Sequence, residues 1–167
     1  GVYTLVLGVL SLGSSVFGGY GDFGHRCARA WSWLILATTG VDVDVHGREL
    51  VTPGEVYVFT SNHQSIYDIP IIFWSLPFQL RIIAKASLGR FPVLGWHLAR
   101  TGHVLVDRSR PGTEAFRRIT TIMARGRSLI VFPEGTRSID GRLRRFKKAI
   151  FVLAIEAGLP VVPVSVT

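Results

Sequence analysis

At 167 residues the chain is long enough for one globular domain with a buried core and too short for two complete domains. Hydrophobic residues make up 48% of it and charged residues only 18%, which argues against a fully solvated protein and favours contact with a membrane. Of the 19 lysines and arginines, 16 lie between Arg81 and Lys148, a span of formal charge +12 that would attract anionic lipids, nucleic acids or nucleotide thioesters. The single cysteine, Cys27, excludes an internal disulfide, and we interpret it as a buried or lipid-facing thiol because no histidine or acid forms an obvious motif with it.

The first forty residues are predicted to form two helices in contact with a membrane. Residues 1–21 are mostly apolar and uncharged, so they are a candidate membrane-spanning segment, although their glycines weaken it. Residues 22–38 place tryptophans beside arginines, which suits a membrane interface; a helical hairpin packed on the rest of the protein is the alternative. We therefore predict membrane-embedding helices over residues 1–40 and one domain over residues 41–167. Because the chain begins on a glycine and ends in an apolar run, we expect residues to be missing at both ends.

From residue 41 onward, predicted strands alternate with predicted helices. Val41, Val43 and Val45 alternate with polar residues, the period of a half-exposed strand. Further strands are predicted at 56–60, 81–84, 103–107, 128–132 and 161–166, and helices at 113–125 and 147–157. The apolar segment 69–80 is too short to cross a bilayer and is expected to be buried or interfacial. This alternation predicts an α/β fold with a central, mostly parallel sheet flanked by helices.

His63 and Asp68, which follow the predicted strand 56–60, are the first candidate catalytic pair. On a regular helix a spacing of five residues turns two side chains about 140° apart, so they can meet only where the chain turns between a strand and a helix. There, a carboxylate bound to the imidazole Nδ1–H would leave Nε2 free to take a proton from a substrate hydroxyl. Alternatively, Ser65 and Asp68 form a helix capping box, although Pro70 would then lie beyond the first turn. Spacing alone leaves both interpretations open.

The second candidate is the loop 132–138, Phe-Pro-Glu-Gly-Thr-Arg-Ser, which follows the predicted strand 128–132. Loops at strand ends are favoured ligand sites in open α/β folds. Gly135 would let the backbone approach a ligand, Arg137 offers a bidentate fork for phosphate, and Glu134 could accept a hydrogen bond from a polyol hydroxyl. An ordinary exposed turn with a solvated arginine and glutamate is the alternative.

Other cations could join the same site. Lys85 and Arg108 each lie at the end of a predicted strand and could reach the same sheet edge as Arg137, where several cations would favour a phosphate monoester. We interpret the basic run at 142–148 as a solvated or lipid-headgroup-facing surface rather than a catalytic one. No metal site is predicted, because the remaining histidines are scattered and lack ligand spacing: His25, His46, His97 and His103.

Four blocks of the sequence, in order, resemble the glycerophospholipid acyltransferases, most closely the 1-acyl-sn-glycerol-3-phosphate (lysophosphatidate) acyltransferases. The blocks are Asn62-His63 with Asp68; Lys85, Gly95-Trp96, Gly102 and Asp107-Arg108; residues 132–138; and Val162-Pro163-Val164. The resemblance covers residues from about 41 to 167 and implies a glycerolphosphate acyltransferase-like fold.

The resemblance also implies roles for individual residues. His63 would be the general base and Asp68 would orient it, while the sn-2 hydroxyl of lysophosphatidate attacks the thioester of acyl-CoA or acyl carrier protein and gives phosphatidate. The residues implied to bind the acceptor phosphate and glycerol are Lys85, Arg108, Glu134, Gly135, Thr136 and Arg137. The implied partners are the two substrates, membrane lipids and acyl carrier protein, with no nucleic acid, cofactor or metal, at the cytoplasmic face of the cell membrane.

Two other functions stay open at this point. Related acyltransferases act on glycerol 3-phosphate, a lysophospholipid or a lyso-ornithine lipid, and only the acceptor pocket would separate them. A non-catalytic basic module that binds membranes or nucleic acid would explain the charge, but not the gathering of His63, Asp68 and Glu134 in loops after strands. Binding to nucleic acid would reveal itself by a steep fall in affinity with salt.

Overall fold

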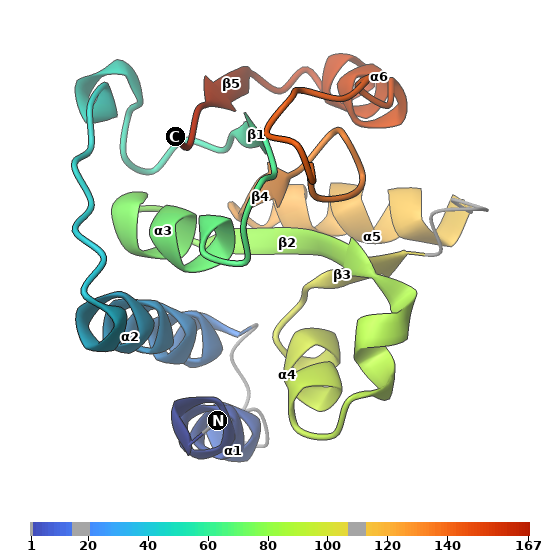
Figure 1. Ribbon diagram of the computed structural model, residues 1–167. Helices are drawn as coiled ribbons and strands as arrows, with labels where there is room; N and C mark the ends of the chain where they lie inside the picture. Colours follow the sequence, from blue (N-terminus) through green and yellow to red (C-terminus); the bar gives the residue numbers. More distant parts are fainter. Residues whose placement is uncertain (1, 15–20, 107–112) are drawn as a thin grey trace.

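The central feature of the fold is a five-stranded sheet with the strand order β3-β2-β4-β1-β5. The computed structural model describes residues 2–14, 21–106 and 113–167 (Figure 1). The strands are β1 (Val58–Ser61), β2 (Leu80–Lys85), β3 (Val104–Val106), β4 (Ser128–Val131) and β5 (Val161–Val164). Every neighbouring pair runs parallel, which confirms the predicted α/β fold with a parallel sheet.

Helices cover both faces of this sheet, and each strand contributes alternate side chains to the two faces. The helices are α1 (Val2–Ser14), α2 (Asp22–Thr39), α3 (Asp68–Ser75), α4 (Leu94–Arg100), α5 (Thr113–Ala124) and α6 (Ala149–Glu156), with short 3-10 turns η2 (Arg48–Leu50) and η3 (Ala86–Arg90). Phe59 and Ile130 face a core that includes Ile72 of α3, whereas Val58 and Leu129 face a second core built with α5 and α6. The sheet is thus the middle of three layers.

Two neighbouring strands send the chain to opposite faces of the sheet. After β1 the chain enters α3 on one face, and after β4 it continues to α6 on the other. In the strand order β3-β2-β4-β1-β5, the chain passes from β1 back to β2 on one side and from β4 to β5 on the other side. Because both crossovers are right-handed, their helices must lie on opposite faces of the sheet. In open α/β sheets, ligands favour the position outside the carboxyl ends of two such strands, and we call this position the crevice.

The N-terminal helices pack on the domain. α2 lies against α3, and α1 lies between α2 and α4 (Figure 1). Arg29 of α2 donates hydrogen bonds to the carbonyls of Leu76 (2.6 Å) and Trp74 (3.2 Å), which would otherwise be unpaired at the end of α3. α1 approaches closely because Gly8 has no side chain: a Cβ there would lie 2.6 Å from the Val93 side chain.

Across residues 2–14, 21–106 and 113–167, no helix is both long enough and apolar enough to cross a bilayer, and part of the predicted membrane-spanning segment 1–21 lies outside the described residues. The helices instead show the packing expected of the alternative, a hairpin resting on the domain. Many apolar side chains of α1 nevertheless face outward, and Phe91 and Trp96 beside α4 are similarly exposed. The outward-facing residues of α1 are Val2, Leu5, Val6, Val9 and Leu10.

The predicted strand at residues 41–45 is also wrong. This segment is extended and keeps the expected alternation, with Val41, Val43 and Val45 half-buried and the residues between them exposed. It pairs with no strand, however, because it runs past the end of α2 toward η2, away from the sheet edges (Figure 1). Alternating hydrophobicity reports which side chains are covered, and it does not report whether the backbone has a strand to pair with.

Three of the histidines that are scattered in the sequence lie close together in the interior. His25, His97 and His103 surround Arg81, a side chain only 1% exposed, at the amino end of β2. His103 Nδ1 accepts the Ile82 amide (3.0 Å), so this ring is neutral at that atom. Burial, followed by the nearby Arg81 cation, lowers the pKa of all three histidines. No group of three side chains in the described part of the chain is arranged to hold a metal.

This cluster should make the fold sensitive to acid. Burial, then Arg81 and Arg29, lower the pKa of His25 from its ordinary 6.5 to about 4. Below about pH 6.5, His25 therefore becomes protonated in the unfolded chain while it stays neutral in the folded one. The contribution of neutral His25 to the free energy of unfolding is complete above this pH and is lost progressively as the pH falls toward about 4. His25 alone should cost on the order of 2 kcal/mol at about pH 5.

Thermal unfolding measured between about pH 7.5 and pH 5 checks this expectation. The His25→Phe variant, which keeps a ring against Phe73, should lose less stability across that window than the wild type. Equal losses in both proteins would show that His25 is not one of the groups responsible.

Candidate active site

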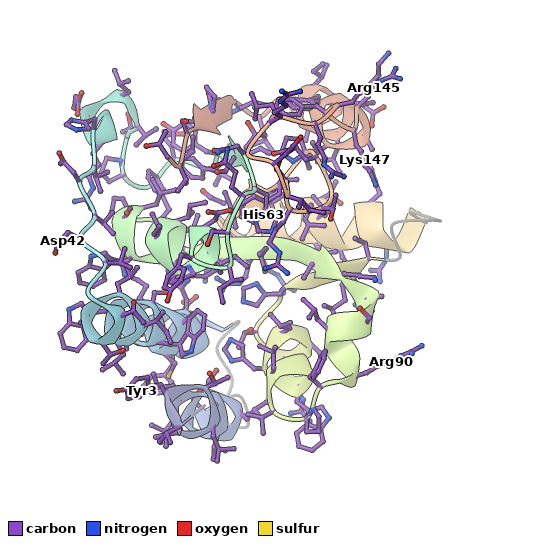
Figure 2. The ribbon with its side chains drawn as sticks, in the orientation of Figure 1. Tyr3, Asp42, His63, Arg90, Arg145 and Lys147 are labelled. Carbon is purple, nitrogen blue, oxygen red and sulfur yellow. The ribbon has the colours of Figure 1, made fainter. Side chains whose placement is uncertain are left out.

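The candidate site lies where β1 and β4 end side by side, and His63 is at its centre (Figure 2). His63 Nδ1 lies 2.7 Å from Asp68 Oδ2, so the predicted contact between the two side chains is present. The chain turns between them, because His63 follows β1 whereas Asp68 opens α3. Asp68 is 2% exposed and the histidine side chain 14%, so the carboxylate is sealed from water while the ring keeps an opening.

Asp68 also makes part of the capping contacts that were the alternative to a catalytic pair. The same oxygen, Oδ2, accepts the backbone amides of Gln64 (2.7 Å) and Ser65 (2.9 Å). The full capping box is absent, since the Ser65 hydroxyl accepts the amide of Tyr67 instead (3.2 Å). α3 begins at Asp68, which places Pro70 in its first turn, where proline is tolerated. One carboxylate therefore both fixes the loop and orients the imidazole.

The loop after β4 holds His63 from the other side. Phe132 stacks on the imidazole with ring centroids 4.0 Å apart and planes 21° apart. Glu134 Oε1 accepts the His63 amide (2.9 Å), and Ser138 donates its own amide to the His63 carbonyl (2.7 Å). Both the ring plane and the backbone of His63 are thus fixed, as a preorganised general base requires.

Glu134 has partners that the sequence did not predict. Its second oxygen, Oε2, accepts the amide of Arg144 (3.0 Å), and the side chain is only 5% exposed. The buried carboxylate is therefore compensated by two backbone donors, as a buried charge must be. This geometry makes Glu134 a link between the loops on either side of it; contact with the acceptor stays a prediction.

The next three predicted residues form the outer part of this loop. Gly135 has a φ of +76°, a backbone conformation that favours glycine, and the end of the Lys147 side chain lies beside it. Thr136 and Arg137 follow it and are exposed. An ordinary exposed turn, the alternative interpretation, therefore explains the exposure of Thr136 and Arg137. It does not explain the hydrogen bonds that attach this loop to His63.

Lys85 ends β2 and is exposed at the same edge of the sheet as His63. One strand, β4, lies between β2 and β1, so their ends are about 10 Å apart sideways, within reach of a lysine side chain and a bound phosphate. Arg108, the remaining predicted cation, lies outside the described residues.

Two residues of the sequence motifs, Phe132 and Asn62, shape the site through contacts that the sequence did not predict. Phe132 lies beside His63 because β1 and β4 are neighbours, a pairing that no local pattern encodes. Asn62 donates to the Val166 carbonyl (2.7 Å) and accepts the Val166 amide (2.8 Å), which joins the histidine loop to the segment after β5. Asn62 belongs to the first sequence motif, and its partner Val166 is 104 residues away.

The arrangement suits proton transfer from a hydroxyl. With Nδ1–H donated to Asp68, Nε2 carries the lone pair and can accept a proton from a substrate. The interactions around His63 supply a base and its orienting carboxylate, and the attacking hydroxyl can come from a substrate.

Comparison with known proteins agrees with this geometry. Residues 42–167 match the family model named Acyltransferase. A 1-acyl-sn-glycerol-3-phosphate acyltransferase of Cocos nucifera is 33% identical over 148 residues, which are 87% of this chain and 46% of that protein. One of the same name from Saccharomyces cerevisiae is 36% identical over 146 residues (84% and 48%). A lyso-ornithine lipid O-acyltransferase of Pseudomonas aeruginosa is 30% identical over 144 residues (86% and 54%).

The fold is shared with a solved structure, the 1-acyl-sn-glycerophosphate (LPA) acyltransferase PlsC from Thermotoga maritima. The TM-score is 0.75 at 26% identity, over 97% of this chain and 70% of that one. The chain spans about half the length of the curated relatives named above. Since the family match runs from residue 42 to the last residue, the chain belongs to the acyltransferase family.

Proposed function

We propose that the protein transfers a fatty acyl group from acyl-CoA or acyl carrier protein to the sn-2 hydroxyl of 1-acyl-sn-glycerol 3-phosphate and so forms phosphatidate. The observation that carries this proposal is the 2.7 Å contact between His63 and Asp68 at the crevice between β1 and β4. The relatives named 1-acyl-sn-glycerol-3-phosphate acyltransferase support the choice of acceptor.

The chemistry needs one base and one oriented hydroxyl. His63 Nε2 removes the proton of the sn-2 hydroxyl as its oxygen attacks the thioester carbonyl and forms a tetrahedral intermediate. When the intermediate collapses, the C–S bond breaks, and the imidazolium returns the proton to the leaving thiolate. Asp68 stabilises the imidazolium in between, because its carboxylate already lies on Nδ1. A thioester is activated enough that no covalent acyl-enzyme is required.

The acceptor phosphate is assigned to the cations around the same edge of the sheet. Arg137 is exposed two residues beyond Gly135, and Lys85 ends β2 on the far side of β4. A phosphate held between them would lie beside the crevice that contains His63. Arg108 follows β3 and is included in this set as a prediction from the sequence.

We also place the protein on the surface of a membrane, at its cytoplasmic face. The support is the apolar surface made by the outward-facing residues of α1 with Phe91 and Trp96, because an apolar helix face beside aromatic residues suits the lipid interface. Acceptor lipid would then reach the crevice from the α1 side of the molecule.

Replacing His63 by Ala should lower kcat by about 100- to 10,000-fold, because this is the usual contribution of a general base. Binding of lysophosphatidate should persist, since the acceptor cations are unchanged. Phosphatidate formation from labelled acyl-CoA measures the first effect, and equilibrium binding of lysophosphatidate measures the second. His46→Ala, which removes an exposed histidine, is the matched control. Equal turnover by wild type and His63→Ala would rule out the mechanism.

The acceptor can be tested through Arg137. Arg137→Ala should raise the KM for lysophosphatidate about tenfold with little change in kcat, because the phosphate contact is made before and during the reaction alike. Arg48→Ala removes an exposed arginine of η2 and serves as the control. Steady-state kinetics with lysophosphatidate, glycerol 3-phosphate and lyso-ornithine lipid would identify the acceptor. A preference for the ornithine lipid that Arg137→Ala does not change would exclude the assigned phosphate site.

Glu134→Gln should weaken the support of His63 rather than the chemistry itself. An amide has one oxygen, so its NH₂ group would face one of the two backbone amides that Glu134 now accepts. We expect a loss of about 2 kcal/mol in the free energy of unfolding, measured by urea titration, together with a lower kcat. Full stability in this variant would show that the two hydrogen bonds are not significant.

A further inference from the structure

A basic loop, defined as residues 141–148, borders the candidate site. Its cations are Arg142, Arg144, Arg145, Lys147 and Lys148, and all five are exposed. Among the described residues, none of the five forms an ion pair with a carboxylate. Five cations so close together repel one another, and a free surface of this kind attracts a polyanion.

The backbone of the basic loop is fastened to the site at several points. Arg144 donates its amide to Glu134 (3.0 Å), and Lys147 donates its amide to the Pro133 carbonyl (2.8 Å). The carbonyl of Arg142 accepts the Ser138 hydroxyl (2.8 Å), and that of Gly141 accepts the Gln64 side chain (3.0 Å). The loop is therefore held in place by its main chain, and only one carboxylate, that of Glu134, separates it from the backbone of His63.

The basic loop and the apolar surface of α1 lie on opposite sides of the site. In Figure 2, Arg145 and Lys147 are on one side of His63 and Tyr3 of α1 is on the other. A bilayer that rests on the outer face of α1 would lie on the other side of His63 from this loop. This arrangement favours a soluble ligand over the lipid-headgroup surface that the sequence left open for these residues.

A soluble polyanion that must reach His63 is required by the reaction itself. The acyl thioester is carried on a phosphopantetheine arm, whose phosphate lies at the far end from the thioester. With the thioester at His63, the length of this arm would place the phosphate away from the imidazole, on the surface around the site. The basic loop provides exposed cations beside the site, and Leu143 and Phe146 add exposed apolar side chains among them.

We propose that the basic loop binds the phosphate-bearing carrier of the acyl thioester, an inference that rests on the acyl transfer proposed above. Lipid acceptor and soluble donor then enter from opposite sides of the crevice. The cations that hold the acceptor phosphate and those that hold the donor phosphate are separate sets, which explains why the site has more cations than one phosphate monoester needs.

The test compares two double variants with the same change in net charge. Arg142→Gln/Arg145→Gln removes two exposed cations of the basic loop and keeps its backbone hydrogen bonds, whereas Arg26→Gln/Arg48→Gln removes two exposed cations elsewhere. The loop variant should raise the KM for the acyl donor about tenfold, at about threefold for each lost contact, and leave the KM for the acceptor unchanged. The control variant should resemble the wild type.

Donor kinetics with acyl-CoA and with acyl carrier protein identify the carrier. A rise in KM for either donor supports the proposal, and the donor that shows it is the carrier bound. Unchanged KM values for both donors would overturn it. Reduced binding to anionic phospholipid vesicles with unchanged donor KM would also overturn it and would assign the loop to a membrane.

Binding of free CoA, measured by calorimetry, separates this inference from the proposed function. It requires no turnover, so it can be read even if the wild type fails to acylate lysophosphatidate. If acyl transfer occurs in the wild type and neither the donor KM nor the CoA affinity depends on the basic loop, only the present inference is lost.

Discussion

The parallel pairing of β1 with β4 is the constraint on which the rest of the structure depends. These two strands are central in the sheet, and their connections leave toward opposite faces, one to α3 and the other to α6. The chain therefore leaves their paired carboxyl ends in opposite directions, and the loops that follow them contact each other there. His63 comes from one loop, and Phe132 and Glu134 come from the other. The histidine is consequently oriented by residues that are far from it in the sequence and adjacent to it only through this pairing.

Buried carboxylates turn that proximity into a fixed geometry. Asp68 accepts the imidazole and two loop amides, and Glu134 accepts the amides of His63 and Arg144. A carboxylate in the interior is costly without donors, so each of these acids requires its partners to stay in place. The same donors would be unpaired without the acids. The reactive ring is thus held by interactions that are strong because they are shielded from water.

The molecule presents two chemically different sides around this site. α1 carries outward-facing apolar residues and packs on α2 and α4, whereas the basic loop carries unpaired cations at the opposite side of His63 (Figure 2). Under the proposed function, the lipid acceptor would approach from the side of α1 and the acyl carrier from the side of the basic loop, and the two would meet at the crevice.

The sequence by itself determined the positions of the five strands and of α5 and α6, and the identity of the chemical groups, whereas α3 and α4 were not predicted as helices. The buried strands were predicted to within about two residues because each is a short apolar run bounded by turn residues. His63 and Asp68 could be named because their spacing permits contact at a strand-to-helix turn, but it also permitted a cap. Only the tertiary structure showed that Asp68 does both, that residues 41–45 have no strand to pair with, and that Glu134 is buried and accepts two loop amides. The physical reason is the same in each case, because each outcome depends on hydrogen-bond partners that other elements supply. Glu134, for example, accepts the amide of His63 although the two residues are 71 positions apart in the sequence. A sequence pattern reports only which side chains a segment would bury.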